Sequence, residues 1–375
     1  MAWIFFFCLF LLAAYLWFIG NLMGFLPALR EGKRPKPFAS GPASVAVLIP
    51  FRNELDHLPA LIGALNAQRL PAGLALSILW INDHSTDGGE EILSRQSMAW
   101  PSDRLSLPVE LTGKKAALRM GLAEAKADWI MCTDADVIPS PDWIARMVAG
   151  ANHQGWDFAT GLVRATGNNL IQRLQTWDMV AMMAITWLGW RTQWWYLANG
   201  ASLLVSRDAA LKTGAWESDG LASGDDLFLV HRLMASGYRG GMVANPEAMV
   251  STQALPNWKQ LWQQRKRWAS KLSALPGQGM WLLGSFLLLV AWIPWILLVA
   301  GWVWKPAWIP AGMFFLAIKG LADAWLLRML GWEFGQRFRF WDLLWLLPMH
   351  AWLLLGSSFF SLAGRKYHWK GRKVS

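Results

Sequence analysis

A long uncharged segment at the start of the chain limits what this sequence can fold into. Residues 2–26 carry no charged side chain, and about 20 apolar residues are enough to cross the hydrocarbon core of a bilayer. The alternative is a cleaved signal peptide, but such a peptide begins with a basic region and has a shorter apolar stretch. We therefore expect residues 1–27 to be a retained membrane anchor whose N-terminus lies outside the cytoplasm.

The C-terminal part of the chain, residues 276–375, has the same apolar character. It contains apolar runs at 279–303, 307–330 and 341–362, followed by a basic tail. Three full crossings would place that tail outside, against the positive-inside rule. We expect one run to be re-entrant or interfacial; the alternative is a tail that breaks the rule. Lys319 and Asp323 lie one helical turn apart, so we expect a structural ion pair rather than a substrate contact.

The net charge of +10 is concentrated beside the apolar runs. Basic residues occupy a linker at 28–43, recur at 265–267 and close the chain. This placement favours attraction to anionic lipid, and no nucleic-acid motif accompanies it. The two cysteines, Cys8 and Cys132, lie in different kinds of segment and imply no disulfide. We expect an integral protein of the bacterial inner (plasma) membrane with its polar domain in the cytoplasm.

Residues 44–255 alternate between strand and helix signals. "SVAVLIPF", "LALSILWIND" and "DWIMCTDAD" are typical of buried strands, and segments with helical spacing separate them. Such alternation predicts an α/β domain with a mostly parallel sheet and helices on both faces. Ligands bind these sheets at the carboxyl ends of the strands. Those ends are where the sequence places Asn82, Asp83, Asp134 and Asp136.

Asp134 and Asp136 flank one alanine at the end of a predicted strand. On an extended backbone, residues two apart share a face, so their carboxylates can converge. Like charges at that distance repel unless a cation lies between them, and a hard divalent cation with oxygen ligands is the usual choice. The alternative is a chance D-x-D that decorates a strand end.

Two further segments combine apolar and polar character. Residues 256–275 are basic on one side and aromatic on the other, which is typical of an amphipathic helix at the bilayer surface. Residues 177–200 are rich in Trp and Met, but their uninterrupted apolar stretch is too short to span a membrane. They suit either an interfacial lip for an acceptor or a buried core helix.

Several short motifs follow one another in a recognisable order. They are "VLIPFRNE", "INDHSTDG", "GKKAAL", "TDADVIPSPDW", "ASGDDLFLVHRL" and "QQRKRW", with "WKGR" near the end. In this order they resemble the family 2 glycosyltransferases with the GT-A fold, over about residues 42–275. The membrane-bound branch of that family includes cellulose and hyaluronan synthases and ceramide and carotenoid glycosyltransferases.

The resemblance implies an inverting, metal-dependent transfer of a sugar from a nucleotide-diphosphate donor, expected to be UDP-linked, to a hydroxyl of a lipid-like membrane acceptor. A processive polysaccharide synthase is the nearest alternative, because it shares the motifs. A non-catalytic membrane scaffold is the third interpretation. A single transfer is favoured because three C-terminal apolar runs are few for a polysaccharide channel.

The resemblance also assigns roles to residues. Asp136 would hold magnesium or manganese on the donor diphosphate, with Asp134 as a second ligand placed toward the ribose or sugar. Lys114 would reach the same pocket, although a lysine at a helix start can also be merely solvated. The candidates around the base and ribose are Pro50, Arg52, Glu54 and Asp83.

Two later motifs complete the expected site. Asp226 matches the family's general base, and Asp225 beside it would influence that base or bind a hydroxyl. The motif here is G-D-D where many relatives have an E-D pair. In the Q-x-x-R-W pattern formed by Gln264, Arg267 and Trp268, the arginine is a candidate clamp for the diphosphate and the tryptophan can stack on a sugar.

Overall fold

The computed structural model describes residues 2–34, 44–217, 225–272, 278–362, 367–369 and 372–374. The chain forms two compact units. One unit groups Met1–Ala28, Gly167–Trp195 and Leu255–Arg365, and the other groups Leu29–Thr166, Tyr196–Ala254 and Lys366–Ser375. Each unit is therefore built from segments that are far apart in the sequence.

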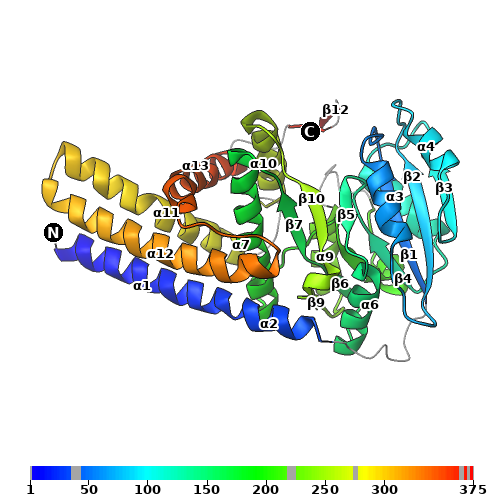
Figure 1. Ribbon diagram of the computed structural model, residues 1–375, viewed down its shortest axis with the longest axis horizontal. Coiled ribbons are helices and arrows are strands. Elements are labelled where there is room, and N and C mark those ends of the chain that lie inside the picture. The colour runs from blue at the N-terminus through cyan, green and yellow to red at the C-terminus, as the bar shows by residue number, and fades with distance from the viewer. Residues whose placement is uncertain are drawn as a thin grey trace. The chain divides into compact units, whose positions relative to one another are not determined.

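The second unit contains a sheet in the order β3-β2-β1-β4-β8-β6-β9 (Figure 1). Its strands are β1 (Ser44–Phe51), β2 (Ala75–Asn82), β3 (Ser102–Ser106), β4 (Trp129–Cys132), β6 (Phe158–Thr160), β8 (Leu203–Ser206) and β9 (Gly240–Met242). The pairs β1–β2, β2–β3, β1–β4 and β6–β9 are parallel, whereas β4–β8 and β6–β8 are antiparallel. The predicted mostly parallel sheet is confirmed.

Helices cover both faces of this sheet, as predicted. The core on one face joins Val45, Val47 and Ile49 of β1 to helices α3 (Leu58–Asn66), α4 (Gly89–Arg95) and α6 (Trp143–Gln154). Helix α5 (Lys114–Glu124) packs on the other face, where a Cβ on Gly121 would lie 3.0 Å from Ile81 Cδ1 and 3.1 Å from Leu48 Cδ2. A larger residue here would require the ends of the Ile81 and Leu48 side chains to shift by a few tenths of an ångström.

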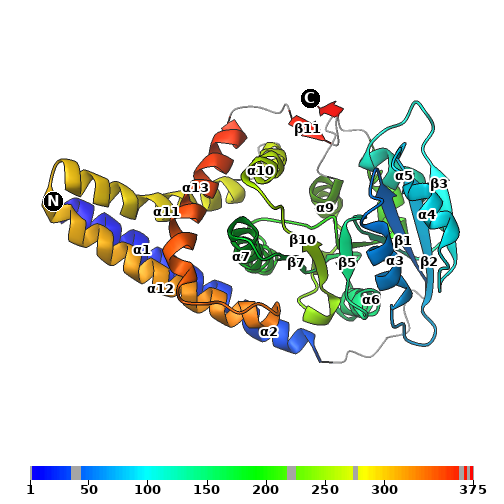
Figure 2. The ribbon, with the colours of Figure 1, turned by 45° about the horizontal axis from the view of Figure 1, so that its top comes forward.

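The remaining elements of this unit are a second sheet, further helices and a pair of short strands. A second sheet has the order β5-β10-β7, with β5 (Val137–Pro139), β10 (Val250–Gln253) and β7 (Val163–Thr166). The helices of this unit also include α8 (Arg207–Lys212), α9 (Asp225–Ala235) and the short η1 (Pro246–Ala248), and β11 (Tyr367–Trp369) pairs antiparallel with β12 (Arg372–Val374). Figure 2 shows α9 end-on.

The first unit is helical. Helices α1 (Ala2–Met23), α11 (Gly279–Val303) and α12 (Ile309–Glu333) run side by side in both views (Figures 1 and 2). The other helices are α7 (Leu170–Thr192), α10 (Trp258–Leu272), η2 (Pro306–Trp308) and α13 (Asp342–Leu362), while α2 (Phe25–Gly32) continues α1 into the segment predicted as a linker. Residues 35–43 of that linker lie outside the described part of the chain.

Two helical stretches among the described residues are long and apolar enough to cross a membrane, Phe5–Gly32 and Gly279–Val303. The other two C-terminal runs form α12 and α13. In α12, Lys319 Nζ donates to Asp323 Oδ2 at 2.6 Å, as predicted, and the Tyr15 hydroxyl of α1 donates to the other oxygen. This network lowers the cost of placing ionisable groups among apolar helices.

Helix α7 accounts for most of the Trp- and Met-rich segment at 177–200. It begins with a capping box in which Asn169 accepts the backbone N–H of Gln172, and many of its apolar side chains are buried, among them Trp177, Val180 and Met183. These burials favour the core-helix interpretation of the segment.

A buried ion pair joins α7 to α10. Arg265 donates to Asp178 Oδ2 with both side chains buried, and His350 Nε2 of α13 lies 3.5 Å from Asp178 Oδ1. Burial by itself would raise the pKa of Asp178, but Arg265 and His350 lower it well below its ordinary value. Arg265, which the sequence placed among membrane-flanking charges, therefore points into the protein.

We predict that Asp178→Asn lowers the stability of the protein, because it leaves the buried Arg265 charge uncompensated, a change that typically costs about 3–5 kcal/mol. The matched control is Asp208→Asn, which breaks an exposed pair with Lys212 and should change little. Thermal unfolding of the two purified variants in the same detergent measures the difference. Equal midpoints would show that the buried pair does not contribute.

Candidate functional site

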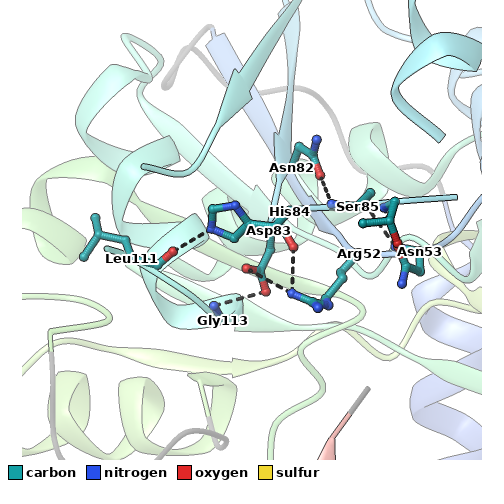
Figure 3. A network of polar contacts seen from close by, with 9 residues as sticks. Arg52, Asn53, Asn82, Asp83, His84, Ser85, Leu111 and Gly113 are labelled. Atoms are coloured by element: carbon teal, nitrogen blue, oxygen red, sulfur yellow. Dashed lines mark hydrogen bonds and ion pairs between the residues drawn. The ribbon is translucent and has the colours of Figure 1, made fainter. Parts of the chain in front are cut away.

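The ends of β1 and β2 are tied together by one buried carboxylate. Phe51 pairs with Asn82 in the register of these strands, so Arg52 and Asp83 follow directly at the same edge. Arg52 donates to the Asp83 carbonyl oxygen at 3.2 Å, and its Nη1 lies 3.9 Å from Asp83 Oδ1 (Figure 3). The backbone N–H of Gly113 donates to Asp83 Oδ2 at 3.1 Å. Asp83 thus connects both strand ends to the start of α5.

The loop after β2 is fixed by further polar contacts (Figure 3). Asn82 Oδ1 accepts the N–H of Ser85 at 2.8 Å, and Asn53 Oδ1 accepts the N–H of Thr86 at 2.9 Å. His84 Nε2 lies 3.0 Å from the carbonyl oxygen of Leu111. Asn53 and His84 both have positive φ, 52° and 57°. Two loops at the strand ends therefore hold one another in place.

Lys114 and Asp134 form an ion pair. Lys114, the first residue of α5, follows Gly113 directly, and its Nζ lies 2.6 Å from Asp134 Oδ1. Because Gly113 binds Asp83, the start of α5 carries contacts to both carboxylates. Four predicted site residues therefore gather around this helix end: Arg52, Asp83, Lys114 and Asp134.

Asp134 and Asp136 lie in a turn between β4 and β5, not on an extended strand. The predicted extended strand through both aspartates is wrong, because β4 ends at Cys132 and a turn precedes β5. Ala135 between them is buried, whereas Asp134 is half-buried and Asp136 is exposed. The turn, and not the alternation of side chains along a strand, therefore buries the alanine and leaves both aspartates outside the core.

These aspartates fit a divalent cation in one specific way. Among the described residues there is no group of three or more His, Cys, Asp or Glu side chains that could hold a metal. Magnesium commonly uses one or two protein carboxylates and completes its shell with substrate phosphates and water. The donor set here therefore suits a cation that arrives with a phosphorylated ligand.

Two predicted pocket residues lie beside this network. Glu54 is 9% exposed, and one of its carboxylate oxygens lies 2.7 Å from His57 Nδ1. Pro50 is within β1, paired in register with Ile81. Glu54 therefore contributes to the loop before α3 as well as being a candidate for ligand contact.

Asp226 is at the start of α9 with both carboxylate oxygens engaged. Its Oδ2 accepts the N–H of Gly200 at 2.9 Å, and its Oδ1 accepts the N–H of Leu227 at 2.8 Å. Sequence reasoning did not single out Gly200 or Asn199 before it. The Asn-Gly pair, a common turn signal, could have identified this segment. The side chain of Asp225 lies outside the described part of the structure.

Gln264, Arg267 and Trp268 belong to α10, in the helical unit. Residues three and four apart share a helix face, so these three side chains lie on one side of α10, and each is half-buried. The guanidinium carbon of Arg265 lies 4.7 Å from the centre of the Trp268 ring. The buried Arg265–Asp178 pair thus supports one residue of the predicted Q-x-x-R-W set.

Two sequence families match the chain. Glycosyl transferase family group 2 matches residues 129–357 and glycosyl transferase family 2 matches residues 46–203. Over 121 residues the chain is 36% identical to undecaprenyl-phosphate 4-deoxy-4-formamido-L-arabinose transferase of Salmonella paratyphi A, covering 32% of this chain and 36% of that protein. The enzyme of the same name from Salmonella newport is 35% identical over the same length. The chain thus matches about a third of the length of these relatives.

A solved structure has the same fold. A mannosyltransferase from Pyrobaculum calidifontis, in complex with GDP-Man and Mn²⁺, superimposes with a TM-score of 0.55 and 17% identity, covering 94% of this chain and 97% of that one. The likeness is in the GT-A fold, to which the mostly parallel sheet of this chain belongs. On the extent of the family match and on this fold, the chain belongs to the family 2 glycosyltransferases and combines a GT-A α/β domain with apolar helices of membrane-spanning length.

Proposed function

We propose that this protein is an inverting glycosyltransferase that moves a sugar from a nucleotide-diphosphate donor, UDP-linked, to a hydroxyl of a lipid-like acceptor in the membrane. Family membership supports sugar transfer. The name of its Salmonella relatives, which act on undecaprenyl phosphate, supports a lipid acceptor. The two apolar helices support a place in the membrane, and we assign it to the bacterial inner membrane with the α/β domain in the cytoplasm.

The observation that carries this proposal is the cluster at the start of α5. Lys114 and Arg52 supply positive charge beside the carboxylates of Asp134 and Asp83. Cationic side chains suit the oxygens of a diphosphate, and strand ends of an α/β sheet are where nucleotides bind. Pro50, Arg52, Glu54 and Asp83 would then surround the base and ribose, while Lys114 would exchange Asp134 for the diphosphate.

A divalent cation fits the same place. Asp136, exposed in its turn, and Asp134 would hold magnesium or manganese together with the donor phosphates. When bound, the cation supplies Lewis-acid stabilisation of the leaving diphosphate. Gln264, Arg267 and Trp268 are proposed as further donor contacts, with Arg267 on a phosphate and Trp268 against the sugar.

Asp226 is proposed as the general base. The acceptor hydroxyl oxygen forms a bond to the anomeric carbon as its proton moves to an Asp226 carboxylate oxygen. The bond from the anomeric carbon to the diphosphate oxygen breaks, and its electron pair leaves with the nucleoside diphosphate. Both Asp226 oxygens accept a backbone N–H, which holds the carboxylate in one orientation for this step. Asp225 would assist from the adjacent position.

One observation favours a second candidate function, in which the sugar is transferred to a lipid phosphate instead of a hydroxyl. The Salmonella relatives are named for undecaprenyl phosphate, and a phosphate acceptor carries its own negative charge, so it needs no base. A processive polysaccharide synthase remains the nearest alternative for a hydroxyl acceptor, and a scaffold without catalysis is the third.

We predict that purified protein, radiolabelled UDP-sugars and a lipid extract give one glycolipid carrying a single added sugar, stable to mild acid. Thin-layer chromatography and mass spectrometry of the product measure this outcome. An acid-labile product would indicate a phosphate acceptor, and a ladder of lengthening products would indicate a polymerase. A complete lack of turnover with every nucleotide sugar would favour the scaffold.

We also predict that Asp136→Asn raises the concentration of Mg²⁺ or Mn²⁺ needed for half-maximal activity by at least about tenfold, because a neutral amide binds a hard divalent cation more weakly than a charged carboxylate. The control is Asp103→Asn, which changes an exposed aspartate of the edge strand β3. Titration of chelator-treated enzyme with metal gives both values. Full activity in excess chelator would contradict the metal assignment.

A further inference from the structure

The segment at residues 196–202, which we call the elbow, connects the end of α7 to β8. Asn199 fixes it to the end of β6 by two hydrogen bonds: its backbone N–H donates to Thr160 Oγ1 at 3.0 Å, and its side-chain Nδ2 donates to the Gly161 carbonyl oxygen at 3.2 Å. Thr160 is fully buried. The elbow therefore rests on a rigid strand end.

Gly161 gives this contact little room to move. Its N–H donates to the Ser202 carbonyl oxygen at 2.8 Å, and a Cβ at this position would overlap Ser202 Oγ. The same Ser202 hydroxyl oxygen accepts Trp143 Nε1–H at 2.8 Å in the core. Gly161 and Ser202 are therefore both held by packed elements, and Asn199 binds beside this pair.

The elbow contacts α9 at two places. Gly200 donates its N–H to Asp226 Oδ2, and His231 Nε2 lies 3.3 Å from the Tyr196 carbonyl oxygen, with the two rings 6.0 Å apart. Burial lowers the pKa of His231, which favours the neutral ring, and an Nε2–H can donate to that carbonyl. The elbow therefore lies against the first turns of the helix that carries the proposed base.

Helix α9 also has attachments that do not involve the elbow. Arg232 donates to the carbonyl oxygen of Gly214, and Lys115 Nζ lies 5.2 Å from the centre of the Phe228 ring. A change in the elbow should therefore change the orientation of the Asp226 carboxylate without displacing the whole helix.

We propose that Asn199 is a positioning residue for the transfer reaction: by holding the elbow on Thr160 and Gly161, it presents the Gly200 N–H that orients the Asp226 carboxylate toward the acceptor. This inference rests on the proposed function, in which Asp226 is the base. It assigns Asn199 no contact with substrate.

The test compares Asn199→Ala, Asp226→Asn and the double variant. We expect Asn199→Ala to lower kcat at least about tenfold, since small misplacements of a reacting group cost this much, with the donor KM within about twofold of wild type. Asp226→Asn should lower kcat by about 10²–10⁴, and adding Asn199→Ala should lower it no further, because both act through one carboxylate.

Three further variants separate a positioning role from an effect on folding. Asn66→Ala removes a half-buried asparagine that bonds the Ser97 carbonyl oxygen and the Ala99 N–H elsewhere in the same unit, and it should leave kcat near wild type. Thr160→Val removes the acceptor for the Asn199 N–H and should repeat the kcat loss. Thr160→Ser keeps the hydroxyl group and should retain the wild-type kcat.

The outcomes separate this inference from the proposed function. Unchanged transfer by Asp226→Asn would overturn the base assignment and the inference with it. A large loss in Asp226→Asn with wild-type kcat in both Asn199→Ala and Thr160→Val would overturn the inference alone. An additive loss in the double variant, or equal losses in Asn66→Ala and Asn199→Ala, would assign Asn199 a general structural role instead.

Discussion

The site depends on one buried carboxylate. Asp83 is 2% exposed, and a charge so far from water is tolerable only when hydrogen bonds and an opposite charge compensate for its lost hydration. Arg52 and the Gly113 N–H provide that compensation. Because Gly113 immediately precedes Lys114, satisfying Asp83 also fixes the place from which Lys114 reaches Asp134. Folding and the proposed ligand recognition therefore share the same few contacts.

A second constraint applies at α9. A carboxylate that accepts a proton must be accessible to the acceptor and yet held in one orientation. In this protein backbone N–H groups supply the orientation, from Gly200 and from Leu227. Backbone donors to both oxygens hold the carboxylate in that orientation. The elbow is thus as much a part of the proposed reaction centre as the helix that carries Asp226.

Much of the α/β domain could be predicted from the sequence because β1, β2 and β4 are buried and apolar enough to be distinguished from their surroundings. The edge strand β3 was not predicted, since its sequence SDRLS is polar. The β5-β10-β7 sheet joins short segments from distant parts of the chain, and no local pattern encodes such pairing. Local signals identify elements, whereas packing decides how they meet.

The candidate site residues divide in the same way, into those that local sequence predicts and those that depend on packing. The motifs predicted Arg52, Asp83, Lys114 and Asp134, and the structure gathers these four around the start of α5. The inward direction of Arg265 and the contact of Asn199 with Gly161 could not be predicted, because each depends on a partner from a distant segment. The turn that holds Asp134 and Asp136 follows from where β4 ends, and apolar pattern alone does not fix such a boundary.

The central claim is that the start of α5 and the turn after β4 together receive a metal-bound nucleoside diphosphate. An experimental structure of the protein with UDP and Mg²⁺ tests it most directly. The account predicts a cation about 2.1 Å from an Asp136 carboxylate oxygen, shared with the diphosphate, and Lys114 Nζ moved from Asp134 to a phosphate oxygen. UDP bound away from these residues, with the Lys114–Asp134 pair intact and no cation at Asp136, would contradict it.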